Sequence, residues 1–499
     1  MHARGGIERP ASAAAVLVGL WIASTASANG RYPAAQQVIE DARDPDHLIV
    51  RATYGLLVTR NGGRSWSLIC EQAVGYGGNE DPTLGLLGDG TLMAGLFDGL
   101  ALVSADGCSV RRPRGGVNEM QIVDVTVDPA DQARGLVLGS ERRQAGGYSH
   151  RLWQTTDHAV SFQEFGTAVP SAFELPLVTA FDVAPSDPMR IYASVLSERP
   201  ALKGMLLRSD DGAVTWTLLP IPDTGPARVP FFTAVAASDP STIYVRVRDL
   251  RRDRLLVSTN GGQVWRSVLE GKAVMAGFAL SPDGTELAIG FGEPPFRSAI
   301  DCEVLGIWKA STQDLVFRKV FSGAVQCLTW TRRGLYACMS QRQQGFEVGL
   351  SLDGGQSFGP LMQLRSVEGL ACQPPSTLAS VCVESWRKLC PLIGTSCGGG
   401  DSGVPPGLPV GLSGCLPDAG RPILPPDAGR GSPRDAAVDP DGGLGATADA
   451  GNDTGPSDAH HVDGSEDAAT AASTSLQLKG GGCGCDVMGR RAASPALWL

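Results

Sequence analysis

The chain has 499 residues, which is too many for one small core and enough for one large repeat domain with additional segments. Its 64 Gly and 34 Pro favour many tight turns between short strands over long helices. The net charge is −10, but residues 398–478 hold 12 acidic residues and 3 Arg, so the remainder is close to neutral. This distribution excludes the basic footprint of a nucleic-acid-binding protein.

The first residues have the parts of an export signal in the right order. Arg4 and Arg9 supply positive charge, residues 11–22 are apolar but too short to span a bilayer comfortably, and Ala26-Ser27-Ala28 is a cleavage site. We therefore expect residues 1–28 to be a signal peptide, with a buried N-terminal helix as the alternative. The mature protein would be exported to the cell surface, the outer membrane or the extracellular space.

The 12 cysteines fit an oxidising compartment. Sequence proximity suggests local disulfides, although spacing alone does not fix the connectivity. The pairs considered are Cys372 with Cys382, Cys390 with Cys397, Cys70 with Cys108, and Cys327 with Cys338. No C-x2-C pair supports zinc, and we expect neither a metal site nor a cofactor.

One motif recurs along residues 29–397: Ser or Thr, any residue, Asp or Asn, any residue, Gly or Ala, two residues, then an aromatic. We call it the turn motif. Its copies begin at positions 59, 155, 209, 258 and 351, and degenerate copies begin at 104 and 310, so the spacing is 41–54 residues. The residues that define it are Thr59, Asn61, Trp66, Ser104, Asp106, Thr155, Asp157, Phe162, Ser209, Asp211, Trp216, Ser258, Asn260, Trp265, Ser351, Asp353 and Phe358.

Upstream of most copies lies an apolar strand, a turn with adjacent Asp and Pro, and a second apolar strand, as in residues 178–195 and 232–247. Each unit thus predicts four antiparallel strands, with the turn motif on the hairpin between the third and fourth. Seven such units predict an all-β, seven-bladed β-propeller. Residues 367–383 look like a further strand pair, which would either close the ring against the N-terminal strands or begin an eighth blade.

The turn motif resembles the Asp-box, or BNR-repeat, superfamily, whose members include sialidases, xyloglucan-cleaving glycosidases, the sortilin ectodomain and photosystem-assembly propellers. The resemblance covers residues 32–390 and implies the propeller architecture. It implies little about activity, because one fold hosts many functions.

After the repeats, residues 398–479 lack aromatics and are rich in Asp, Ala, Gly and Pro, which predicts a disordered acidic linker. Residues 480–499 contain Cys483 and Cys485 in a Gly-rich stretch, followed by Arg490 and Arg491. This tail resembles the C-terminal sorting signals of myxobacterial surface proteins and would provide membrane or surface anchoring. It lacks their apolar membrane-length run, and two ordinary cysteines on a flexible end are the alternative.

Candidate site residues fall on the propeller face opposite the turn motifs, where loops commonly carry function. Loops between second and third strands are rich in Arg and would favour an anionic glycan or an acidic partner, unless they are simply solvated. Their candidates are Arg142, Arg143, Arg199, Arg251, Arg252 and Arg297. Connections between blades carry the carboxylates that a glycosidase would need in a pair roughly 5–10 Å apart. These are Glu80, Asp81, Glu119, Glu174 and Asp223.

A sialidase would also need an Arg triad and a Tyr–Glu pair. The early Arg-Ile-Pro motif of that family is missing, and no nucleophile, zinc-protease or phosphate-binding motif is present. The sequence therefore favours a non-catalytic binding module for a protein or a glycan. A glycoside hydrolase and an assembly or scaffolding factor are the alternatives.

Overall fold

In the computed structural model, residues 33–397 are described, apart from residues 79, 144–146, 198–201, 250–251, 294–300, 374 and 396. The signal peptide expected at residues 1–28, the linker at 398–479 and the tail at 480–499 lie outside the described residues. Within the described part of the chain, no helix is long and apolar enough to cross a bilayer.

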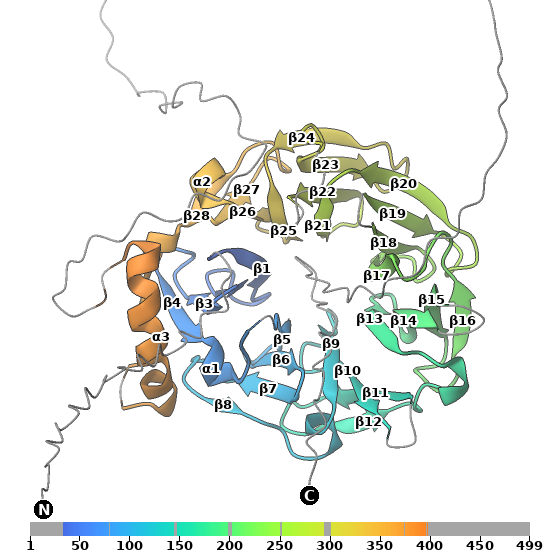
Figure 1. Ribbon diagram of the computed structural model, residues 1–499, viewed down its shortest axis with the longest axis horizontal. Helices are drawn as coiled ribbons and strands as arrows, with labels where there is room; N and C mark the ends of the chain where they lie inside the picture. Colours follow the sequence, from blue (N-terminus) through green and yellow to red (C-terminus); the bar gives the residue numbers. More distant parts are fainter. Residues whose placement is uncertain are drawn as a thin grey trace, which may run out of the picture. The chain divides into compact units, whose positions relative to one another are not determined.

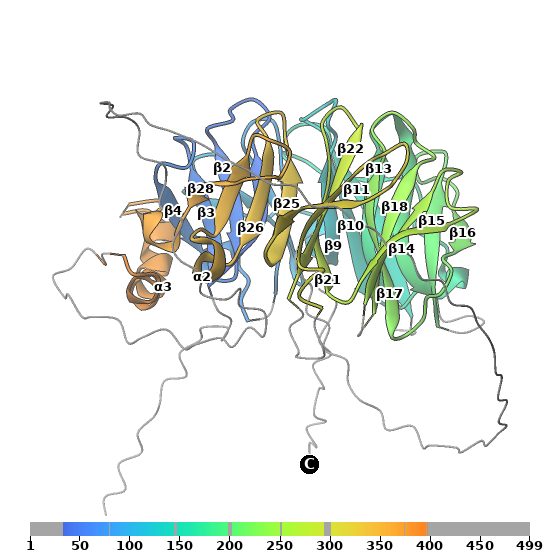
Figure 2. The same ribbon diagram turned by 90° about the horizontal axis from the view of Figure 1, so that it is seen from above.

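The strands form seven antiparallel blades arranged in a ring, so the predicted all-β propeller with seven four-stranded blades is confirmed (Figures 1 and 2). In each blade the first strand lies nearest the centre of the ring and the later strands lie progressively further out (Figure 1). We call the face that carries the connections from strand two to strand three, and from each blade to the next, the upper face. The lower face carries the remaining turns, including the turn motifs.

The strands of blades one to four follow one another along the chain. Their bounds are β1 (Ala35–Glu40), β2 (Leu48–Ala52), β3 (Gly55–Thr59), β4 (Trp66–Cys70), β5 (Thr83–Leu86), β6 (Leu92–Leu96), β7 (Gly99–Val103), β8 (Val110–Arg111), β9 (Gln121–Val127), β10 (Gly135–Arg142), β11 (Tyr148–Thr155), β12 (Gln163–Phe165), β13 (Leu177–Ala184), β14 (Asp187–Ser197), β15 (Lys203–Ser209) and β16 (Thr217–Pro220).

Blades five to seven repeat the pattern, and a final strand joins blade one. The bounds are β17 (Arg228–Val235), β18 (Ile243–Asp249), β19 (Asp253–Ser258), β20 (Arg266–Gly271), β21 (Val274–Leu280), β22 (Glu286–Gly292), β23 (Gly306–Ser311), β24 (Arg318–Ser322), β25 (Val325–Trp330), β26 (Leu335–Met339), β27 (Val348–Ser351), β28 (Gly359–Met362) and β29 (Val367–Leu370). The helices are α1 (Glu71–Val74), α2 (Gln341–Gln344) and α3 (Thr377–Ile393), with short 3-10 turns at Gly116–Asn118, Ser171–Phe173 and Leu364–Ser366.

The apolar core lies between neighbouring blades. One cluster joins the inner and middle strands of blade seven to those of blade one, through Tyr336, Val348, Val38 and Leu57. Similar clusters connect the following blades. Each sheet thus buries both faces, which explains why the middle strands β2, β6 and β26 are buried along their whole length.

The turn motifs lie on the hairpins between the third and fourth strands of all seven blades. In blade seven, the Ser351 hydroxyl accepts a hydrogen bond from Gly355 N (2.7 Å), and Asp353 Oδ1 accepts one from Ser357 N (3.0 Å). These side chains replace backbone partners that a tight turn cannot supply. The residue whose N–H donates to the Ser or Thr hydroxyl has a positive φ even where it is not Gly, as at Ala159 (63°) and Ala213 (66°).

Ring closure differs from the expected strand pair at residues 367–383. Only β29 forms a strand, and it pairs in parallel with β4 as a fifth strand of blade one. Most of the remainder belongs to α3, which is capped by Ser376, whose hydroxyl accepts a hydrogen bond from Ala379 N (3.0 Å). It lies outside the outer strand β4 (Figure 1), where Leu378 and Cys382 enter one core cluster and Trp386 and Ile393 enter another. No eighth blade is present among the described residues.

Two of the disulfides expected from sequence are confirmed, Cys327–Cys338 and Cys390–Cys397. The other two pairings were wrong. The structure joins Cys70 to Cys382 and Cys108 to Cys372. Because residues 372–382 return to the outer edge of blades one and two, each cysteine there lies closer to an N-terminal cysteine than to its neighbour in sequence. We call β29, α3 and these two disulfides the closing segment.

Candidate functional site

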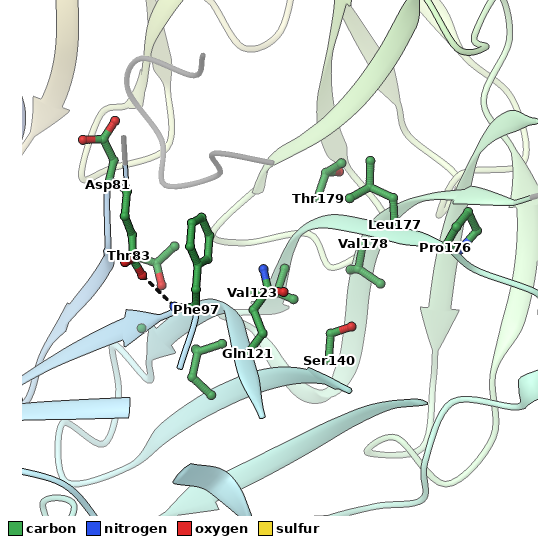
Figure 3. A pocket seen from close by; sticks show the side chains of 13 residues that line it. Asp81, Thr83, Phe97, Gln121, Val123, Ser140, Pro176, Leu177, Val178 and Thr179 are labelled. Atoms are coloured by element: carbon green, nitrogen blue, oxygen red, sulfur yellow. Dashed lines mark hydrogen bonds between the residues drawn. The ribbon is translucent and has the colours of Figure 1, made fainter. Parts of the chain in front are cut away.

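A small pocket opens on the upper face between blades two, three and four (Figure 3). It lies where the connection leading into β5 meets the β6–β7 turn and the first residues of β9 and β13. The lining residues are Glu80, Asp81, Thr83, Gly95, Phe97, Gln121, Ile122, Val123, Ser140, Pro176, Leu177, Val178 and Thr179. Its enclosed space measures about 30 Å³, which has room for only a water molecule or two.

The carboxyl group of Glu80 lies in this pocket and has a perturbed pKa. Its Oε1 accepts a hydrogen bond from Phe97 N (2.6 Å), drawn as a dashed line in Figure 3. Burial raises the pKa of Glu80 to about 7, the nearby Asp98 and Asp81 charges add to the rise, and the Phe97 N–H and Arg112 oppose it. A carboxyl group with a pKa near 7 exchanges its proton at physiological pH, as functional carboxyls often do.

Thr83 is the first residue of β5 and is 5% exposed. Its hydroxyl has no hydrogen-bond partner among the described residues. A buried hydroxyl without a partner costs free energy, so its presence points to a water molecule or a ligand that completes it. Gly95 lies directly opposite, because a Cβ added there would lie 2.5 Å from the Thr83 hydroxyl oxygen.

Phe97 is one of the few large apolar side chains that the described surface leaves exposed, at 44%. Its ring stands at the pocket wall between the segment of Asp81 and Thr83 and the first residues of β9 (Figure 3). Gln121 and Ser140 lie at neighbouring positions of β9 and β10 and complete the polar side of the pocket. An exposed aromatic beside buried hydrogen-bonding groups is typical of a recognition site.

The carboxylates predicted from sequence are only partly brought together. Glu80 and Asp81 line this pocket, whereas Glu119, Glu174 and Asp223 do not. Glu119 is exposed, and Asp223 forms an ion pair with the buried Arg254 (2.9 Å). Glu174 ends a short 3-10 turn with a left-handed backbone (φ 48°).

The Arg-rich loops are described only in part. Arg142 and Arg143 are exposed at the upper end of blade three. Arg252 is exposed and forms an ion pair with Glu270 of its own blade (2.5 Å). Arg199, Arg251 and Arg297 lie outside the described residues.

Sequence reasoning missed a set of buried polar residues that join neighbouring blades just below the upper face. Arg51 donates to the carbonyl of Pro82 (2.7 Å), and Asp253 accepts from Met275 N (2.8 Å). Glu347 accepts from Ala35 N (3.2 Å), which ties blade seven to the first strand of blade one. Each contact satisfies the backbone where an inner strand begins, so these charges serve the ring rather than a ligand.

No group of three or more His, Cys, Asp or Glu residues in the described part of the chain is placed to hold a metal ion.

No family model and no curated protein matches the chain. Among solved structures, the β-propeller domain of Swd1 from Myceliophteria thermophila is 13% identical, with a TM-score of 0.40, covering 62% of this chain and 95% of that one. The extracellular domain of a one-component system from B. thetaiotaomicron is 9% identical, with a TM-score of 0.42, covering 62% of this chain and 37% of that one. The GH74 xyloglucanase from Xanthomonas campestris is 15% identical, with a TM-score of 0.27, covering 65% and 55%. At such values these similarities carry no argument about activity.

Proposed function

We propose that this chain is an exported recognition module of the Asp-box type, which binds a protein or a glycan at the upper-face pocket without chemically altering it. The observation that carries the proposal is the unpartnered hydroxyl of Thr83, buried beside the exposed ring of Phe97. An apolar surface next to hydrogen-bonding groups that lack partners is the arrangement that a specific ligand completes.

The disulfides support the exported location. Four join described cysteines, two of them across more than 260 residues of sequence. Such bonds persist in oxidising environments, which agrees with the export signal expected at residues 1–28.

Catalysis is the second candidate, because one observation favours it. The pKa of Glu80, raised to about 7, suits the general acid of a glycoside hydrolase. The second carboxylate weighs against it. Asp81 is the next residue in the chain, and in Figure 3 its carboxylate points away from the Phe97 ring rather than across the pocket. Glycosidases need two carboxyl groups that flank the scissile bond.

A glycan array probed with the purified full chain, with detection of released sugar in the same wells, separates these readings. Binding without release supports the recognition role. Release that is lost in Glu80→Gln would overturn the non-catalytic role and establish Glu80 as the acid. If neither glycan binding nor sugar release is detected, the ligand of the recognition module would be a protein. Cross-linking through a photoreactive group placed at position 97 would test this.

A further inference from the structure

The charged residues that line the upper-face pocket are all acidic. Glu80 and Asp81 belong to it, and no Lys or Arg is among its described lining residues. Asp98 lies close enough to raise the Glu80 pKa. The guanidinium of Arg112, which lowers the pKa of Glu80, forms an ion pair with Asp98 (3.1 Å). The described lining of the pocket thus carries negative charge and disfavours anions.

Glu80 has one oxygen that is fixed and one that is not. Oε1 accepts from Phe97 N, while Oε2 has no hydrogen-bond partner among the described residues. Burial removes water from this carboxylate, and Asp98 and Asp81 add negative charge nearby, so the carboxylate takes up a proton more readily, in agreement with its raised pKa. A bound cation would add positive charge at the carboxylate and displace that proton.

Two further features are independent of the acidic charge. The Thr83 hydroxyl is buried, lines the pocket and has no partner. The ring of Phe97 is 44% exposed at the wall, and an aromatic face attracts cations and also packs against the apolar face of a sugar ring.

The size of the pocket limits what enters it. About 30 Å³ admits a single ammonium or hydroxyl group and excludes a sugar ring, which would have to lie above it. Gln121 and Ser140 would then be available to the neighbouring hydroxyls of such a ring.

We propose that the upper-face pocket binds a sugar with a free amino group, whose ammonium enters between Glu80 and Thr83 while the ring lies on Phe97. This inference rests on the proposed recognition function and names its ligand class.

The test compares three sugars that differ at one position, namely glucosamine, glucose and N-acetylglucosamine, by calorimetry with the full chain at pH 7. We expect glucosamine to bind at least tenfold more tightly than the other two. Glu80→Gln keeps the shape and the acceptor for Phe97 N and should remove that preference. Asp89→Asn removes an equal charge from an exposed turn of the same blade on the lower face, and should retain it.

Proton release gives a second readout. At pH 6, an entering ammonium should displace the Glu80 proton, so titrations in buffers of different ionisation enthalpy should record release approaching one proton per ligand. Glu80→Gln should release none. Phe97→Leu keeps the hydrogen bond from the backbone N–H of residue 97 to Glu80. If its unfolding midpoint matches the wild type, this variant should bind glucosamine several-fold more weakly and release the same number of protons per ligand.

Equal affinity for the three sugars, or an amine preference that survives Glu80→Gln, would overturn the inference. So would binding of Nα-acetyl-lysine methylamide without glucosamine, because that result assigns the pocket to a protein side chain. A glycan without amino groups that binds the array would overturn the inference while the recognition function stands. Failure of every probe and of the array would overturn the inference and the glycan form of the function together.

Discussion

Removal of the closing segment's disulfides should destabilise the ring by an amount that depends on how the two bonds are nested. Cys70–Cys382 spans 312 residues and Cys108–Cys372 spans 264, the second inside the first. With one bond in place, the other closes a loop made only of the 38 residues from Cys70 to Cys108 and the 10 from Cys372 to Cys382. Whichever of the two bonds forms first therefore closes a long loop and stabilises the fold more than the bond that forms second.

The chain-entropy relation gives about 4 kcal/mol for a closed loop of about 48 residues and about 6 kcal/mol for the first, long closure. Replacing both cysteines of either bond with Ala should thus cost about 4 kcal/mol, and removing both bonds should cost about 10 kcal/mol. The larger figure is comparable to the whole stability of a typical domain, so the variant without either bond should be largely unfolded.

Guanidinium unfolding of the full chain measures these differences. The control removes Cys327–Cys338, a bond within blade seven that spans 11 residues and should cost about 3 kcal/mol. If either long-range bond proves less important than this control, or if the two long-range effects add without excess, the nested-loop reasoning is refuted.

Three further predictions concern single side chains. Folding stability should fall as pH rises from 5 to 8, because burial raises the pKa of Glu347 to about 7 and the folded state therefore holds a proton that the unfolded state has lost. Glu347→Gln should remove roughly 3 kcal/mol of this pH dependence, as measured by denaturation at several pH values. Ser351→Ala should cost about 1–3 kcal/mol, since Gly355 N loses its partner. Ser311→Ala should cost less, because in that blade Leu315 N donates to the Ser311 carbonyl, which the substitution keeps. Thr83→Val should raise the unfolding free energy of the unliganded protein by about 1 kcal/mol, because it replaces an unpartnered hydroxyl with a methyl group of similar size. A lower unfolding free energy in thermal denaturation would show instead that the hydroxyl has a structural role.

The ring could be predicted from the sequence because each complete copy of the turn motif supplies side chains that satisfy the backbone hydrogen-bonding groups of its own hairpin. A Ser or Thr that bonds a backbone N–H four residues later, and an Asp or Asn that bonds the far side of the same turn, satisfy the hairpin from within, as Thr59 and Asn61 do in blade one. Local chemistry of this kind is visible in sequence at the five complete copies, which begin at positions 59, 155, 209, 258 and 351.

The closing segment could not be predicted in the same way. Residues 367–383 were predicted to form a strand pair, but Ser376 caps a helix whose buried residues recur with helical spacing from Leu378 to Ile393. The choice between these readings depends on the edge of blade one, which is hundreds of residues distant. The disulfide partners of Cys372 and Cys382 depend on the same long-range contact, so spacing favoured the wrong pairs.

The candidate site was predicted only through its charged members. Glu80 and Asp81 stood out in a connection between blades, whereas Thr83, Gln121 and Ser140 look like ordinary strand residues. Their importance depends on which strand ends meet at the upper face and on a hydroxyl left without a partner. Neither property has a signature in one sequence.

The most direct test of the recognition role is the glycan array with released-sugar detection, run in parallel with wild-type protein and Thr83→Val. Binding without sugar release, weakened at least tenfold in Thr83→Val although that variant is no less stable, is the predicted result. Sugar release, or equal binding by both proteins, would contradict a non-catalytic recognition site at the upper-face pocket.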